Sequence, residues 1–137
     1  MTNLKFASMI LGLGGLMGPA VIHGQNVTNL VAKVPFDFRV GETSLSAGSY
    51  NVRELTRAGV AQLRNTKTGQ AMMIAATRSK GSNSAGTSKL VFNCYGGKCF
   101  LSQIWYEDDP TVHALWPSKV EKEIARGPQT SVIVAMR

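Results

Sequence analysis

Apolar and polar residues alternate along most of the chain after residue 30, which is the pattern of half-buried β-strands. In the stretch from 34 to 40, VPFDFRV, every second residue is apolar. Pro35 has no amide donor, so this strand is predicted at a sheet edge or with an irregular start. Similar alternation predicts further strands near 45–55, 60–65 and 70–77, separated by turns rich in Gly, Asn and Thr.

The stretch KLVFNCYGGKCFLSQIWY, from 89 to 106, predicts a β-hairpin. Gly96 and Gly97 favour a two-residue turn, because glycine accepts positive φ at both central positions. If Tyr95 and Lys98 close the turn, the next pair outward is Cys94 opposite Cys99, with both side chains on one face. Strand alternation places other large residues on that cysteine face, and it is therefore predicted to point into the core: Leu90, Phe92, Leu101 and Trp105.

The C-terminal region predicts one short helix followed by a last strand. Ser118 and Glu121 form an S-x-x-E capping box, and Gly127-Pro128 ends the helix. The run SVIVAM at 131–136 is apolar at most positions, which predicts a strand covered on both faces. The fold class is therefore mainly all-β, a small antiparallel barrel or sandwich of about seven strands with one short helix before the last strand.

The N-terminal segment has the composition of a secretory signal peptide. Lys5 is followed by the apolar, glycine-containing run FASMILGLGGLMGPAVI and by small residues near Gly24. A membrane anchor is the alternative, but this run is shorter than the roughly 20 apolar residues that span a bilayer and contains Pro19. We expect residues 1–24 to be removed, with cleavage after Ala20 as the alternative, and residues 25–137 to form a single β-rich domain with no transmembrane segment. The protein is thus predicted to be exported, to the periplasm or the extracellular space.

The charge balance is basic. The formal net charge is +7, and removal of Lys5 leaves 14 basic against 8 acidic residues, or +6. Export and the scatter of the basic residues along the chain argue against nucleic acid as the partner. The remaining alternatives are anionic envelope polymers or lipid head groups, and a charge that only keeps the protein soluble.

Cys94 and Cys99 are the only two cysteines of the sequence. They cannot complete a four-ligand zinc site, and C-x4-C on a hairpin is not the C-x-x-C of a redox motif. In an oxidising compartment a disulfide is favoured, and its short loop limits the entropic stabilisation to about 2 kcal/mol. We predict a Cys94–Cys99 disulfide, no metal site and no cofactor.

Candidate catalytic residues are few. An acidic loop with a nearby histidine, Glu107, Asp108, Asp109 and His113, could hold a hard cation or position a base, although adjacent carboxylates before a proline more often form a solvated turn. The sequence has no G-x-S-x-G turn for a nucleophile. Three aromatic residues could line a ligand pocket, although packing in the core is their more common role: Trp105, Tyr106 and Trp116.

Two blocks of the sequence resemble a family of small, exported, functionally uncharacterised bacterial proteins. VPFDFRVGETSLSAGSYNV resembles the family's opening "vPFdF-vG---lpAGtY-v", and LVFNCYGGKCFLSQIW resembles its block "lvFh-YGd-yFLs-vW". The segment SKVEKEIAR is similar to the helix that follows. The resemblance spans roughly residues 34 to 126 and implies export and a β-rich domain, but no catalytic activity. Ser46, Gly97 and the two cysteines depart from the family pattern, which suggests that the disulfide is particular to this chain.

Three classes of function stay open on this basis. The first is a non-enzymatic exported β-domain with a binding or structural role in the envelope or outside the cell. The second is a barrel that carries a small apolar ligand, which requires a hollow interior. The third is a hydrolase that uses the loop from Glu107 to His113, which requires those side chains to converge in a cleft.

The composition of the N-terminus generates a first prediction. Protein recovered from the exported fraction should begin at Gln25, because cleavage after Gly24 fits the small-residue pattern. Intact-mass measurement of that material checks this, and a mature form that still contains residues 6–22 would contradict it.

Overall fold

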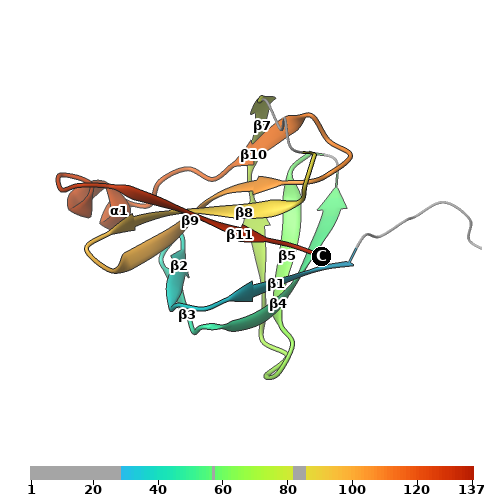
Figure 1. Ribbon diagram of the computed structural model, residues 1–137, viewed down its shortest axis with the longest axis horizontal. Helices are drawn as coiled ribbons and strands as arrows, with labels where there is room; N and C mark the ends of the chain where they lie inside the picture. Colours follow the sequence, from blue (N-terminus) through green and yellow to red (C-terminus); the bar gives the residue numbers. More distant parts are fainter. Residues whose placement is uncertain (1–28, 57, 82–85) are drawn as a thin grey trace, which may run out of the picture.

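The β-strands form two mainly antiparallel sheets in the computed structural model, which describes residues 29–56, 58–81 and 86–137 (Figure 1). The predicted signal peptide, 1–24, lies outside the described residues. The first sheet has the order β1-β4-β5-β6. Its strands are β1 (Asn29–Val34), β4 (Gly48–Thr56), β5 (Val60–Asn65) and β6 (Ala71–Ala75).

The second sheet has the order β11-β8-β9-β10-β7, and β2 adds to β9 in parallel while pairing with β3. Its strands are β2 (Phe38–Val40), β3 (Thr43–Leu45), β7 (Thr77–Lys80), β8 (Lys89–Tyr95), β9 (Lys98–Trp105), β10 (Thr111–Ala114) and β11 (Thr130–Ala135). The one helix of the described residues, α1 (Lys119–Ile124), precedes β11 as predicted. None of the helical structure described is long and apolar enough to cross a membrane.

The described residues form 11 strands where the sequence pattern predicted about seven. Two predicted strands are broken in two by a change of direction, at 35–37 and at Ala76, the short strand β3 lies before the turn expected at Ala47-Gly48, and β10 was not predicted. At Ala76 the chain passes from β6 in the first sheet to β7 in the second. Local alternation persists through such corners, so the pattern did not mark them.

The core lies between the two sheets. Tyr50, Val52 and Leu63 of the first sheet belong to one buried apolar cluster with Phe92 and Ile104 of the second. Along one side the sheets meet where the segment after β11 runs beside β1, with a bridge between Ala32 and Met136, and Figure 1 shows β1 next to this end of the chain. The sheets are not closed, so the all-β prediction is confirmed in its sandwich form and not as a barrel.

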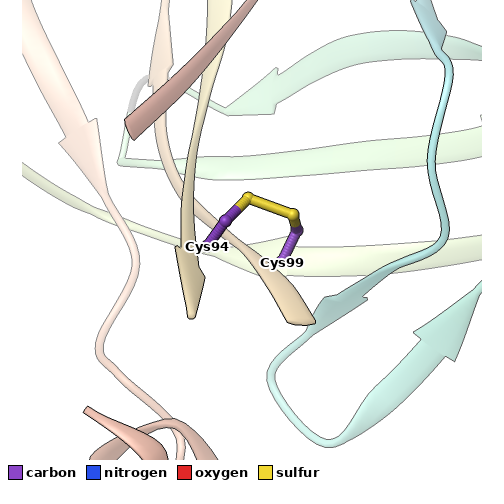
Figure 2. The surroundings of a disulfide bond; sticks show 2 residues. All are labelled: Cys94 and Cys99. Atoms are coloured by element: carbon purple, nitrogen blue, oxygen red, sulfur yellow. A yellow bond between two sulfur atoms is a disulfide. The ribbon is translucent and has the colours of Figure 1, made fainter. Parts of the chain in front are cut away.

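The β8–β9 hairpin has the predicted register and the predicted disulfide. Tyr95 lies opposite Lys98, and Cys94 lies opposite Cys99 with a Cα–Cα distance of 4.0 Å. Both turn glycines have positive φ, 57° at Gly96 and 87° at Gly97. The disulfide, shown in Figure 2, bridges the two strands next to the turn and belongs to the buried apolar cluster. It therefore braces one hairpin and does not connect the two sheets.

Trp105 does not lie where the sequence predicted, because β8 and β9 are joined through a β-bulge. The register shifts by one residue after Phe92–Leu101, so that Leu90 lies opposite Ile104 and Lys89 lies opposite Trp105. One extra residue moves all later side chains of the strand to the other face. Ile104 therefore takes the core position that alternation assigned to Trp105. The indole packs on the outer face, where the Lys89 ammonium lies 5.3 Å from its ring centroid.

The last strand also differs from its prediction. β11 is not covered on both faces, because most of its residues are exposed and Ile133 is 62% exposed; it is also the edge strand of its sheet. The helix before it begins as predicted, with the Ser118 hydroxyl accepting a hydrogen bond from the Glu121 amide at 3.2 Å. The Glu121 carboxylate is buried and accepts a hydrogen bond from the Tyr95 hydroxyl at 3.1 Å, which attaches α1 to the disulfide hairpin.

Gly59 forms the turn between β4 and β5 that faces the corner at Ala76. Its φ is +106°, and a Cβ atom built on it would lie 2.2 Å from the carbonyl oxygen of Ala76. Its own carbonyl accepts a hydrogen bond from the Ala76 amide at 2.9 Å. The corner between the two sheets therefore requires glycine at position 59, both for its backbone conformation and for the space.

Gly59→Ala should destabilise the fold by about 3 kcal/mol or more, because positive φ alone costs roughly 1–2 kcal/mol and the backbone clash adds to it. Gly96→Ala is the matched control, since Gly96 also has positive φ but open space around its Cβ position. Urea denaturation of both variants measures the difference. Equal losses of unfolding free energy would contradict the role of the Ala76 contact.

Candidate functional site

Asp109 and His113 meet at one end of the core, as a hydrolase or metal site of the acidic loop would require. His113 lies on β10 opposite Ile104 of β9, so its ring points into the core, and its side chain is 2% exposed. Asp109 lies in the loop between these strands. Its Oδ2 lies 2.9 Å from Nε2 of His113. The loop between β9 and β10 thus folds back so that its carboxylate covers the buried imidazole.

Asp109 is the centre of a hydrogen-bond network. Its Oδ1 accepts hydrogen bonds from the Thr111 amide at 2.9 Å and from the Thr111 hydroxyl. The guanidinium of Arg78, on β7, donates to both carboxylate oxygens at 3.5 and 3.3 Å. One carboxylate therefore holds together β7, β10 and the loop that precedes β10.

These contacts govern the acidity of Asp109. Burial raises the pKa of this carboxyl group, but hydrogen bonds from His113 and Thr111 and the positive charge of Arg78 outweigh burial. The net effect is a pKa well below the usual range for aspartate. Asp109 is therefore a carboxylate at any pH near neutrality.

Glu54 and Tyr106 complete the cluster. The sequence of the acidic loop gave no indication of Glu54. Glu54 follows Tyr50 and Val52 on the core-facing side of β4, and its carboxylate lies close to the other two groups. The candidate ligand atoms of Glu54, Asp109 and His113 all lie within 4.8 Å of one another. The Tyr106 ring packs edge-on against the His113 ring at 4.9 Å between centroids.

The Tyr106 hydroxyl is buried and has no hydrogen-bond partner among the described residues. Burial raises the pKa of this phenol well above its usual range, and the negative charges of Glu54 and Asp109 raise it further. The group thus stays protonated and keeps a hydrogen to donate, beside two carboxylates. A buried polar atom without a partner is uncommon in native proteins.

The other residues proposed from the sequence do not join this cluster. Glu107 and Asp108 are exposed, and the Glu107 amide donates to the Ser88 hydroxyl at 2.9 Å. Trp105 packs on the outer face, and Trp116 is 79% exposed with its Nε1 donating to Thr77. The three aromatic residues proposed as a ligand-pocket lining therefore do not share one pocket.

A separate open groove lies at the other end of the second sheet, between the β2–β3 hairpin and the β8–β9 turn. Its volume is about 380 Å³. The side chains and backbone that line it come from these two hairpins and their flanks: Asp37, Phe38, Arg39, Ser44, Leu45, Ser46, Gly97, Lys98 and Cys99. The wall formed by β2 is held by its parallel pairing with β9, with Phe38 beside Cys99.

The groove carries two cations and one carboxylate. Arg39 is half-buried and Lys98 is exposed, and among the described residues neither forms an ion pair. Asp37 accepts a hydrogen bond from the Ala47 amide at 2.8 Å, which fixes it against the β3–β4 corner. The chemical character of the groove is thus that of a shallow cationic surface with hydroxyl groups from Ser44 and Ser46.

Comparisons with known proteins leave both sites without a precedent. No family model matches the chain, and no curated protein or solved structure shows significant similarity to it. The resemblance of the two sequence blocks to exported bacterial proteins therefore stays a prediction.

The network around Asp109 generates a prediction about acid stability. The folded-state pKa of Asp109 is lowered below its unfolded value near 4, so the carboxylate stabilises the fold above about pH 4 and this contribution is lost as the pH falls further. Asp109→Asn should therefore lower the free energy of unfolding at pH 7 by about 1–3 kcal/mol. The difference from the unmodified chain should shrink in acid.

Urea denaturation at pH 7 and at pH 3 measures this effect. Asp108→Asn is the matched control, because it removes the same charge from an exposed neighbour. A variant difference that is the same at both pH values, or equal losses in the two variants at pH 7, would contradict the assignment of the network to Asp109.

Proposed function

We propose that the protein is an exported, non-enzymatic β-domain that binds acidic polysaccharide of the envelope or the cell exterior through the groove beside the disulfide hairpin. The observation that carries the proposal is that this groove is lined by two cations, Arg39 and Lys98, neither of which forms an ion pair within the described part of the chain. Two cations and the serine hydroxyl groups that line the same groove suit sulfate or carboxylate groups repeated along a polymer.

Export is supported by two independent features. The N-terminal composition is that of a signal peptide, and the Cys94–Cys99 disulfide fits an oxidising compartment. The net charge of +6 after removal of Lys5 adds a long-range attraction for polyanions that brings the ligand to the groove.

The two alternative functions have less support. A carrier of a small apolar ligand needs an internal cavity, whereas the space between the sheets is filled by large, fully buried side chains that include Tyr50, Leu63 and Phe92. A hydrolase needs a base that its substrate can reach, whereas the His113 side chain is 2% exposed.

Retention on an immobilised sulfated polysaccharide across a salt series tests the proposal. The unmodified chain should bind at low salt and elute as the Debye length shortens towards about 8 Å. The double variant Arg39→Gln/Lys98→Gln should lower the affinity roughly tenfold, about 1.4 kcal/mol, through loss of two charge-assisted contacts.

The matched control is Arg53→Gln/Lys67→Gln, which removes two exposed cations of the first sheet and its turn and gives the same net charge. If binding depended on total charge alone, both double variants would weaken equally, and that outcome would rule out the groove. Binding to vesicles that contain anionic phospholipid, with no retention on polysaccharide, would contradict the proposed ligand class.

A further inference from the structure

The cluster at the other end of the core has the composition of a metal site. Glu54, Asp109 and His113 offer two carboxylate groups and one imidazole nitrogen, and their ligand atoms lie within 4.8 Å of one another. One imidazole with two carboxylates suits a divalent transition metal such as Zn²⁺ better than it suits Mg²⁺ or Ca²⁺, which prefer oxygen ligands alone. Each ligand comes from a different part of the fold, β4, the loop after β9, and β10.

The distances fit such an ion with a small adjustment. Ligand atoms at about 2.0–2.2 Å from a tetrahedral zinc ion lie roughly 3.3–3.6 Å apart. Nε2 of His113 and Oδ2 of Asp109 are 2.9 Å apart in a hydrogen bond, so zinc binding has to displace the shared proton and separate the two atoms by a few tenths of an ångström. The carboxylate of Glu54 has to approach by a small rotation of its side chain, which is half-buried at the rim of the core.

The local backbone explains why a glutamate points into this end of the core. Tyr50, Val52 and Glu54 alternate on the inner face of β4, and the pairing register of β4 with β5 shifts between Glu54 and Thr56. A bulge at this point ends the regular ladder and redirects the side chain beside it, a device that is frequent next to functional sites. The carboxylate thereby occupies a position where alternation calls for an apolar residue.

The Tyr106 hydroxyl is an independent sign of a missing ligand. Within the described residues, this oxygen is buried and has no hydrogen-bond partner. Tyr106 is 8% exposed, and its ring packs against that of His113. A water molecule bound to a metal would give this hydroxyl a partner. A water alone would also do so, but it would add no charge to balance the two carboxylates, of which Arg78 offsets one.

The charges of the surroundings also favour a cation. Arg78, the positively charged residue that contacts the cluster, pairs with Asp109 from the solvent side with 38% of its side chain exposed. It offsets one of the two negative charges of Asp109 and Glu54, so the cluster with a neutral imidazole carries a net charge of −1. A divalent ion would meet a site of opposite charge.

We propose that Glu54, Asp109 and His113 bind a divalent transition-metal ion of the Zn²⁺ class, with a water in the remaining position hydrogen-bonded to Tyr106. This site is distinct from the polysaccharide groove. It ties β4 of the first sheet to the β9–β10 loop of the second, so its occupation should also raise the melting temperature.

Calorimetric titration of the untagged, chelator-treated chain with ZnCl₂, together with native mass spectrometry, tests the proposal. One zinc ion should bind per chain. Glu54→Gln should weaken zinc binding by roughly 10–100-fold or more, because loss of a residue that only supports a metal ligand already has an effect of this size. Glu107→Gln removes an exposed acid outside the cluster and should leave zinc binding unchanged. Tyr106→Phe should weaken binding by a smaller factor than Glu54→Gln.

A second measurement does not depend on how well the Glu54 variant folds. The sequence has two histidines, His23 and His113, and His23 lies in the predicted signal peptide, so the chain from Gln25 has a single imidazole. Zinc should bind this chain and shift its imidazole signals in ¹H–¹⁵N correlation spectra. Absence of 1:1 binding, equal affinity in the Glu54 and Glu107 variants, an unmoved imidazole signal, or a preference for Mg²⁺ or Ca²⁺ would each overturn the proposal.

Discussion

The contact of Phe38 with two other rings holds the two sheets together. Phe38 packs edge-on against Tyr50 of the first sheet and against Phe92 of the second, with centroid distances of 5.3 Å in both pairs. The hydroxyl of Tyr50 then donates to the carbonyl of Ser46 at 2.6 Å and so fixes the corner between β3 and β4. The position of the β2–β3 hairpin, and with it one wall of the groove, depends on this aromatic contact.

The two ends of the core differ in chemistry because the strands end differently. Near the disulfide hairpin the interior is closed by apolar side chains, and the groove lies on the surface beside it. At the far end two polar residues lie at the core, Glu54 near the end of β4 and Tyr106 directly after β9, and both are close to His113 of β10. Buried polar groups cost free energy unless they are satisfied, so their concentration at one end marks it as the chemically distinct part of the molecule.

The sequence predicted those features that depend on neighbouring residues. Gly96-Gly97 determines the hairpin register and therefore the disulfide, and the Ser118 capping box determines where the helix begins. Prediction from the sequence failed where one extra residue shifts the pairing register of two strands. The bulge that moves Trp105 to the outer face depends on how β8 and β9 pack together, and alternation along β9 alone does not reveal it.

The residues of the candidate site also differ in how far the sequence predicted them. Asp109 and His113 are four residues apart, so the loop sequence was enough to place them together. Glu54 and Arg78 come from distant strands, and their meeting with the loop depends on the topology of the whole sandwich. The inward position of a glutamate in register with Tyr50 and Val52 was the one signal in the sequence that pointed to it.

The parallel pairing of β2 with β9 has a consequence for the order in which the molecule folds. Strands β4, β5 and β6 follow one another along the chain, as do β8 and β9, so these units close short loops. The ladder between β2 and β9 has two residue pairs. Its partners Phe38 and Cys99 lie 61 positions apart in the sequence (99 minus 38). Closing so long a loop costs conformational entropy, and contacts between residues far apart in the sequence form late. A ladder this short also needs less free energy to open than the longer ladders of the hairpins. We therefore expect the wall of the groove to be completed late in folding, when Phe38 packs against Tyr50 and Phe92 and joins the two sheets.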